Sequence, residues 1–468
     1  MTTPPVDAAA AKEALRDPRL DFFRGLGMFI ILIAHIPWNS WKNWIPARFG
    51  YSDATEIFVF CSGAASAIAF LKIFNTRGWW VGTMRIAFRI WQLYWCHIAL
   101  FFAVVATLIF IDNSIEDANR SYLTTLNLRR FVNNPVEFMP SLFGLHYVPN
   151  FFDILVMYMV ILALIPVMVA LSWRGKWWAM GFSILLWAMA SQPWLVFVDF
   201  SADKIVETKS LWVWFKTMIG LQEGVPVFQA LNLPAEPTTR NDRNWFFNPF
   251  GWQLIFFTGF AFAVGWLPKP PVKWYLILLA IAVLIPAFFM DTDGVPARRL
   301  LAAQPEIDNI LITWGLSEQT LTEWRTWHRE NLRVIFSKQF FGVLRYVHFL
   351  ALAYLVWIAA GDAGKRLPKT GLGGGIVTVV RRVGQQSLAV FIFSIWVSWI
   401  IGAWISEMDV DGKGGEPVAQ WVITVANLNG IALLIIVAYI ARYFRNPPWS
   451  RKTALATTGI APQDQIQR

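Results

Sequence analysis

Ten long apolar runs constrain this chain more than any other feature of its sequence. Each has about 18 or more residues with few charges, the length that a helix needs to cross a bilayer. Of the 468 residues 56% are hydrophobic and only 15% are charged, against about 25% in soluble domains. We therefore predict an all-α, polytopic membrane protein with transmembrane helices near 24–44, 53–74, 89–111, 151–172, 177–199, 250–267, 273–290, 341–361, 385–405 and 418–441.

The distribution of Lys and Arg predicts the orientation of these helices. Alternate connections are rich in Lys and Arg, whereas the short loops on the opposite side hold only Lys42, Arg48 and Lys413. Because basic loops stay in the cytoplasm, we predict that both termini are cytoplasmic. The long loops 112–150 and 200–249, with a third at 291–340, then fall on the periplasmic side. The net charge of +10 is explained by this topology, so we predict no nucleic-acid partner.

The remaining sequence features predict one membrane domain, residues 1–450, followed by a disordered cytoplasmic tail, residues 451–468. The two cysteines, Cys61 and Cys96, lie in apolar segments, and their spacing does not match a metal site. The GLGGG stretch at 371–375 resembles a phosphate-binding loop but lacks the Lys-Ser/Thr pair and a preceding strand. We interpret it as a flexible linker on the cytoplasmic side.

The first apolar run contains an unusual histidine. In RLDFFRGLGMFIILIAHIPW (19–38), ten uncharged residues separate Arg24 from His35, which places the two about 16 Å apart along a helix. A helix over 24–44 would put Arg24 at the inner surface and His35 near the bilayer midplane. Ionisable residues at that depth are candidates for function. The alternative is a structural histidine that is hydrogen-bonded to a neighbouring helix.

Two carboxylates begin the second apolar run, in YSDATEIFVFCSG (51–63). Asp53 and Glu56 are three residues apart and therefore share one helical face. A structural interpretation also exists, since Asp53 suits an N-cap and Glu56 a first helical turn. A short outer loop makes the first two helices antiparallel neighbours, so His35 and Glu56 can approach as an imidazole–carboxylate pair suited to general-base catalysis.

Other polar groups in the apolar runs are weaker candidates. Arg345 and His348 share a face near the outer end of the eighth run, although an interfacial arginine often has only an anchoring role. The others are Gln92, Tyr94 and His97 in the third run and Asp153 at the outer start of the fourth.

These segments resemble the OpgC family of membrane acyltransferases, which add succinyl groups to osmoregulated periplasmic glucans. The resemblance is carried by RLDFFRGLGMFIILIAHIP and RFGYSDATEIFVFCSG, and later by NPFGWQLIFFTG (248–259) and LRYVHFLALAYL (344–355). It covers roughly residues 16–445. Arg24 and His35 also match the Arg-x10-His pattern of the broader acyltransferase-3 family.

The chain departs from the family pattern at two places. Members often carry Asp directly before the histidine, where this chain has Ala34, and a familiar Gly-Arg-x-Ser-Leu stretch appears here as GQQSL (384–388). The first departure removes one carboxylate partner for His35 and makes Glu56 and Asp53 the remaining candidates.

The resemblance implies an O-acyltransferase of the bacterial inner membrane, with succinyl-CoA as co-substrate, glucan as acceptor, and no permanently bound cofactor or metal. It implies His35 as general base, supported by Glu56 or Asp53, while direct transfer and an acyl-histidine intermediate both stay open, as does an oligomer. Further roles are assigned by position. The oxyanion is assigned to Gln92, Tyr94 or a backbone N–H and the succinyl carboxylate to Arg345, with Asp153 and His348 as further acceptor-site candidates. The cations assigned to the CoA phosphates are Arg24, Arg85, Arg89, Arg381 and Arg382.

Two other functions fit the same sequence. Ten helices with intramembrane His, Glu and Arg also suit a transporter or exporter of glucan or another solute. No pair of helices broken by Gly or Pro recurs in two halves of the chain, as inverted-repeat transporters would require. The second alternative keeps the chemistry and replaces succinyl by acetyl.

Overall fold

The computed structural model describes residues 17–114, 121–191, 231, 233–236, 243–290, 312–313, 315, 317–319, 333–408 and 418–445. Among these residues the elements are α-helices and short 3-10 helices, and strand-like pairing is limited to one isolated bridge between Pro234 and Asn244. The all-α prediction is therefore confirmed. The tail 451–468 and most of the loops 200–249 and 291–340 lie outside the described residues.

Each predicted apolar run contains one helix. They are α2 (Pro18–His35), α3 (Ala54–Arg77), α4 (Trp79–Ser114), α8 (Asp153–Ser172), α9 (Lys176–Ser191), α12 (Pro249–Val264), α13 (Trp274–Met290), α18 (Val343–Ala360), α20 (Ser387–Glu407) and α21 (Gln420–Arg445). Six of these, α3, α4, α8, α18, α20 and α21, are long and apolar enough to cross a membrane, and α12 and α13 are shorter apolar helices. The structure thus supports a membrane protein, while ten spans stay a prediction.

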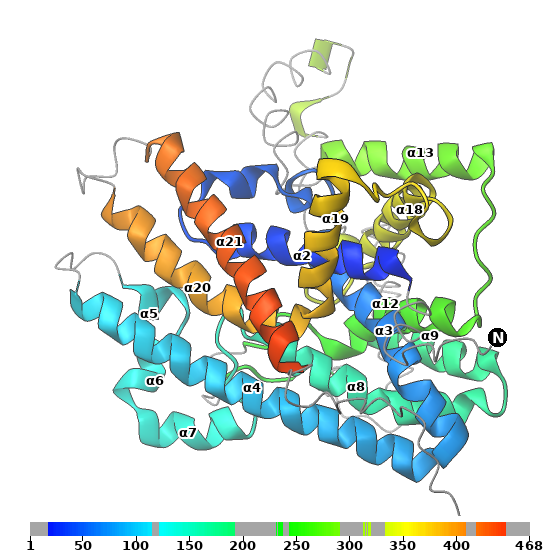
Figure 1. Cartoon of the computed structure of the whole chain (residues 1–468), viewed down its shortest axis with the longest axis horizontal. Helices are drawn as coiled ribbons and strands as arrows, with labels where there is room; N and C mark the ends of the chain where they lie inside the picture. Colours follow the sequence, from blue (N-terminus) through cyan, green and yellow to red (C-terminus); the bar gives the residue numbers. More distant parts are fainter. Residues whose placement is uncertain are drawn as a thin grey trace, which may run out of the picture.

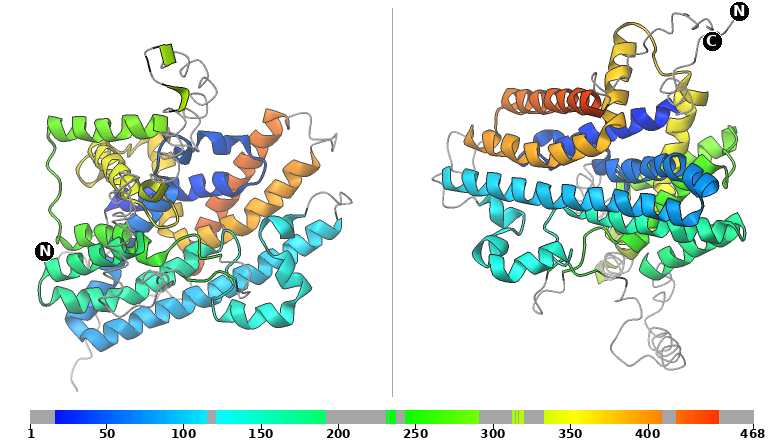
Figure 2. Two further views of the ribbon diagram at one scale, coloured as in Figure 1. Left: turned by 180° about the vertical axis from the view of Figure 1, so that it is seen from behind. Right: turned by 60° about the horizontal axis from the view of Figure 1, so that its bottom comes forward.

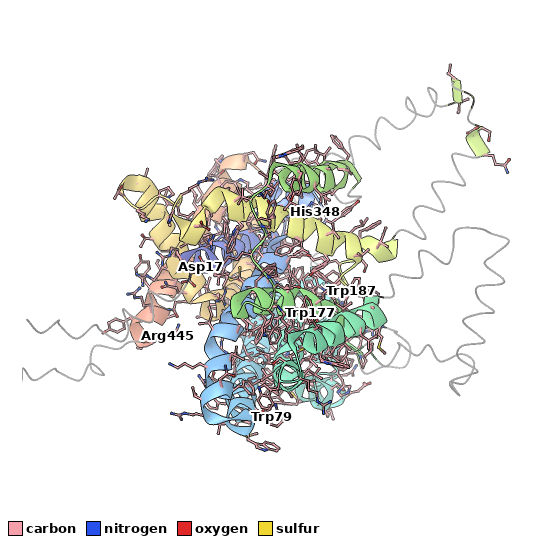
Figure 3. All side chains as sticks on the ribbon, turned by 90° about the vertical axis from the view of Figure 1, so that its right-hand side faces the viewer. Asp17, Trp79, Trp177, Trp187, His348 and Arg445 are labelled. Carbon is pink, nitrogen blue, oxygen red and sulfur yellow. The ribbon has the colours of Figure 1, made fainter. Side chains whose placement is uncertain are left out.

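The long helices form a bundle whose two ends are distinct (Figure 1). At the left-hand end, α4 and α20 finish and α21 begins, and the short helices α5 (Tyr122–Thr125), α6 (Arg129–Asn133) and α7 (Pro135–Phe143) lie beside them. Figure 2 shows that these short helices stay at this end in the other views. Figure 3 looks from the opposite end, where Trp79 and Trp177 mark the starts of α4 and α9.

Helix α2 corrects the boundaries expected from the apolar run. It begins at Pro18, capped by Asp17, and its last residue is His35. The predicted helix over 24–44 is wrong because Ile36 precedes Pro37, and the residue before a proline is pushed into extended backbone. His35 therefore lies at the C-terminal end of its helix, rather than near the middle of a span that continues beyond it.

Helices α3 and α12 pack closely through glycine. A Cβ on Gly63 would lie 1.9 Å from the carbonyl oxygen of Phe256, and one on Gly259 would lie 2.1 Å from that of Phe60. Gly63 thus faces Phe256 and Phe60 faces Gly259, so the residue numbers run in opposite directions along the two helices, which are antiparallel. Small residues allow backbones to approach in this way in membrane proteins.

The GLGGG stretch is not a flexible linker. It opens helix α19 (Gly371–Gln385), which packs across α2. A Cβ on Gly25 of α2 would lie 1.9 Å from the Val380 carbonyl oxygen, and one on Gly384 would lie 1.8 Å from that of Asp21. The low helix propensity of glycine predicts a linker, but contact with α2 stabilises the helix and overrides that propensity.

The predicted orientation can be tested with two reporter fusions. A reporter active only in the periplasm should be inactive when fused after Arg451 and active when inserted near Thr239, because of the Lys and Arg asymmetry between the loops. Reporter activity in whole cells is the measurement. The opposite pattern would reverse the topology and put the outer loops in the cytoplasm.

Candidate active site

The N-terminus of α3 holds two of the predicted carboxylates in a capping box. Asp53 precedes the helix, and its Oδ1 accepts a hydrogen bond from the Thr55 N–H at 2.6 Å. Glu56 reaches back, and its Oε2 accepts from the Asp53 N–H at 2.7 Å. The capping role that the sequence suggests for these two residues is therefore present, but it uses only one oxygen of each carboxylate.

The second oxygen of each carboxylate pairs with a cation from the start of α18. Lys338, five residues before that helix, contacts Asp53 Oδ2 through its Nζ. Arg345, in the first turn of α18, donates from Nη1 to Glu56 Oε1 at 2.9 Å. We call Asp53, Glu56, Lys338 and Arg345 the charged cluster. It is largely shielded from solvent, with side-chain exposure of 0% for Glu56, 10% for Asp53, 12% for Arg345 and 31% for Lys338.

The charge of Asp53 is set by these contacts. Burial by itself would raise the pKa of the Asp53 carboxyl, but the Lys338 ammonium, together with the Arg345 guanidinium, holds it below its usual range. Asp53 is therefore an anion at neutral pH, and the contact with Lys338 is an ion pair. Such a pair in a shielded place is sensitive to loss of either partner.

His35 ends α2, the helix that packs on α3, and the fields of Lys338 and Asp53 reach its ring. The imidazole packs edge to face on Phe151, with ring centroids 5.0 Å apart, and its buried Nδ1 has no hydrogen-bond partner among the described residues. Both carboxylate oxygens of Glu56 are used elsewhere, so the structure gives no hydrogen bond between His35 and Glu56.

His348 follows Arg345 by three residues on α18 and is fixed by the loop before α3. Its Nδ1 shares a hydrogen bond of 2.7 Å with the Ser52 hydroxyl, and Tyr51 packs edge to face on its ring. Gly50 is needed at this contact, since a Cβ there would lie 2.4 Å from His348 Nε2. The structure therefore brings together His35, Asp53, Glu56, Arg345 and His348, as candidates from three separate segments (Figure 3 labels His348).

The other candidates have hydrogen bonds or ring contacts with residues outside this group. Gln92 is on the exposed face of α4 and accepts from Arg89 at 3.1 Å, and Tyr94 donates to the Phe143 carbonyl at 2.9 Å. Asp153 accepts from the Phe246 N–H at 3.2 Å and so holds the loop before α12. His97 is fully buried, with its ring edge to face on Phe152 and neither nitrogen hydrogen-bonded among the described residues.

The predicted donor-binding cations fall into two groups. Arg24 of α2 donates to the Ser387 hydroxyl at 2.5 Å, within the GQQSL stretch, and α2 packs on α19, which carries Arg381 and Arg382. Arg85 and Arg89 instead lie on α4, with Arg85 exposed and its guanidinium 5.7 Å from the Phe88 ring. The structure thus places three of the five cations on two touching helices.

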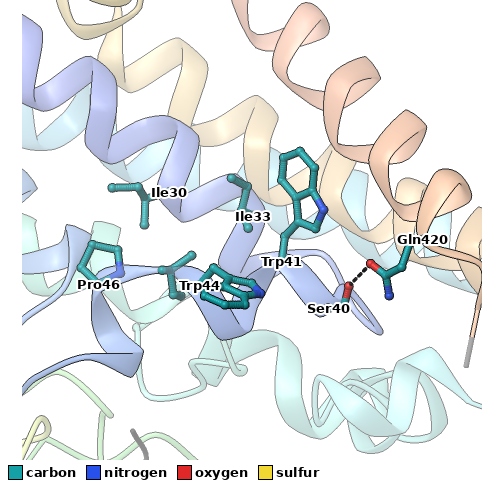
Figure 4. Close-up of a pocket in the computed structure, with 8 residues that line it drawn as sticks. Ile30, Ile33, Ser40, Trp41, Trp44, Pro46 and Gln420 are labelled. Atoms are coloured by element: carbon teal, nitrogen blue, oxygen red, sulfur yellow. Dashed lines mark hydrogen bonds between the residues drawn. The ribbon is translucent and has the colours of Figure 1, made fainter. Parts of the chain in front are cut away.

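A hollow of about 530 Å³ opens beside the C-terminal half of α2 and contains none of the predicted site residues (Figure 4). At its rim the Ser40 hydroxyl donates to Gln420 at 3.1 Å. The lining is mostly apolar and consists of Ile30, Ile33, Ser40, Trp41, Trp44, Ile45, Pro46 and Gln420.

Sequence reasoning missed two residues of this region, Lys338 and Ser52. Lys338 is seven residues before Arg345, in the turn that precedes α18, and stands among phenylalanines in FSKQFFG (336–342). A lone cation in an aromatic stretch at the start of a predicted span was the available signal. It was overlooked because it lies in the long loop 291–340, where no periodicity relates a residue to the helices.

A comparison of the sequence with known proteins identifies its family. The family model described as "OpgC protein" matches residues 16–446. No curated protein and no solved structure matches the chain. Membership of that family indicates a glucan-modifying acyltransferase, in agreement with the resemblance of the sequence. Because the match spans nearly the whole of the 468 residues, the chain belongs to the OpgC family.

Proposed function

We propose that this protein transfers a succinyl group from cytoplasmic succinyl-CoA to a hydroxyl of osmoregulated periplasmic glucan, in the inner membrane of a bacterium. The observation that carries the proposal is the arrangement of α2. This one helix carries Arg24 in its first half and ends at His35, eleven residues further on, beside the charged cluster. A cation for a phosphorylated donor and a base for a hydroxyl acceptor are thus held about 16 Å apart on one rigid element.

The reaction that fits His35 is direct acyl transfer. The imidazole takes the proton of a glucosyl hydroxyl while the hydroxyl oxygen attacks the carbonyl carbon of the thioester. The tetrahedral intermediate collapses, the carbon–sulfur bond breaks, and the CoA sulfur leaves with the proton that the imidazolium returns. The ester product and CoA thiol account for all atoms, and no metal or further co-substrate is needed.

The charged cluster supports this step electrostatically. Burial of the His35 ring and the field of Lys338 oppose the imidazolium, and Asp53 is the anion whose field acts in the other direction, so we assign Asp53 the support of the imidazolium, the role that the sequence assigns first to Glu56. Glu56 is assigned the fixing of Arg345 and of the N-terminus of α3. An anion near a histidine stabilises its protonated form without a direct hydrogen bond.

The donor end of the proposal rests on Arg24. A guanidinium suits phosphate recognition because its N–H groups form a planar fork. Arg381 and Arg382 are on α19, the helix that packs against α2, and we assign them to the same donor. Arg85 and Arg89 are on α4, and we assign them no part in binding CoA.

Mass spectrometry of periplasmic glucan from cells with and without this protein tests the proposal. We expect glucan carrying one added succinyl mass per modified site only when the protein is present. An added acetyl mass would keep the chemistry and change the donor. Unmodified glucan that accumulates in the cytoplasm of cells lacking the protein would contradict the proposal and identify an exporter.

A further inference from the structure

Of the two cations of the charged cluster, Lys338 is the more accessible to another ligand. Its ammonium has three N–H donors, and one is used on Asp53. The side chain is 31% exposed, against 12% for Arg345. The Phe247 ring centroid lies 5.7 Å from the Nζ, and Phe247 is itself buried, which gives the ammonium an apolar wall on one side.

Arg345, the cation first assigned to a succinyl carboxylate, is less accessible than Lys338. Its Nη1 bonds a glutamate that is fully buried, at 2.9 Å, and its Nε, which has no hydrogen-bond partner among the described residues, is itself buried. A ligand carboxylate that displaced Glu56 from Nη1 would leave that glutamate without its charged partner in a place closed to water, which is strongly destabilising. The structure therefore favours Lys338 over Arg345 as the cation for an incoming anion.

The charges of the cluster determine how the carboxylate of a bound acyl group is compensated. The cluster pairs two carboxylates with two cations, so a third carboxylate brings one uncompensated negative charge. When His35 takes the proton of the acceptor hydroxyl, the positive charge of its imidazolium is matched by the negative charge that forms on the tetrahedral intermediate. Lys338 therefore compensates the ligand carboxylate both in the bound donor and in the transition state, and its effect on donor choice is measured by kcat/KM.

We infer that Lys338 binds the terminal carboxylate of the acyl group and so selects a dicarboxylic thioester over a neutral one of the same length. The inference rests on the proposed function and deepens it, because it names the residue that recognises the donor acyl chain. Lys338 is a specificity residue in this scheme, and His35 remains the base.

The test compares succinyl-CoA with butyryl-CoA, which has the same number of acyl carbons and no terminal carboxylate. The full chain is purified in lipid, and kcat/KM is measured for each donor with glucan as acceptor. Lys338→Gln should lower the succinyl-to-butyryl ratio of kcat/KM by about 10- to 100-fold, the range expected for a hydrogen bond to a charged group. Lys338→Arg should keep most of the preference, and Lys42→Gln, which changes a lysine outside the cluster, should leave the ratio unchanged.

Two results would overturn the inference in different ways. Equal losses with both donors would mean that Lys338 serves only to hold Asp53, and the proposed function would stand. Wild-type protein that acylates glucan with neither donor would refute the proposed function itself, and the inference with it.

A second measurement uses the wild-type protein, so it does not depend on a folded variant. Lys338 is labelled with an amine-reactive reagent, and peptide mass spectrometry follows the rate. Succinyl-CoA should slow the labelling of Lys338 more than butyryl-CoA does at equal saturation. Equal protection by the two donors would contradict carboxylate binding at this residue.

Discussion

Replacing His35 by Asn or by Ala should lower kcat/KM for glucan acylation by about 10²- to 10⁴-fold, the usual contribution of a general base. Asn keeps hydrogen-bonding capacity but cannot take up a proton, so it should rescue little of the activity. A purely structural histidine predicts the reverse, with substantial rescue by Asn and losses that follow the amount of folded protein. Initial rates with purified protein, normalised to folded protein, distinguish the two.

His146→Asn is the matched control for this series. His146 lies in the loop before α8 and is exposed, so the same substitution there should leave activity unchanged. If His35→Asn turns over at near the wild-type rate, the proton acceptor is another residue. His348, which is held next to Arg345 by Ser52, would then be the first histidine to test.

Replacing Glu56 by Ala should lower the free energy of unfolding by roughly 3–5 kcal/mol, the cost of breaking a buried ion pair by removing one partner. The change leaves the Arg345 Nη1 and the Asp53 N–H without their acceptor in a fully buried place. Glu56→Gln keeps an oxygen for one of these donors, and its loss should be smaller. Equilibrium unfolding in detergent gives the free energies.

Two further variants separate the ion pair from the general effects of substitution. Glu137→Ala removes an exposed acid from the first turn of α7, and we expect a change within about 0.5 kcal/mol. The double variant Glu56→Ala with Arg345→Met removes both charges and should recover part of the loss. Wild-type stability in Glu56→Ala would show that the pair contributes nothing to the fold.

The helices themselves follow from the sequence because a bilayer demands long apolar segments. All ten runs contain a helix, and the capping residues at Asp53 and Asn248 are visible in the local sequence. The end of α2 also has a local signal, since the Ile36-Pro37 pair is typical of a helix stop.

What the sequence does not reveal is which helices touch. Helix α19 forms despite five N-terminal residues that include four glycines, because α2 lies against it, and no local pattern contains that information. The pairing of Lys338 with Asp53 joins residues 285 positions apart. Asp53 and Glu56 were recognised as a pair from their spacing, whereas the cations that hold them depend on how α18 docks beside α3.

The glycine contacts between α3 and α12 have a mechanical consequence for the site. Two backbones in such close antiparallel contact leave no layer of side chains between them that could rearrange, so the helices cannot slide or roll over one another without steric collision. The pair therefore moves as one strut, and Asp53 and Glu56 at the head of α3 keep a fixed position along it. A displacement of α18 relative to this pair would stretch the two salt bridges that join α18 and the turn before it to the head of α3.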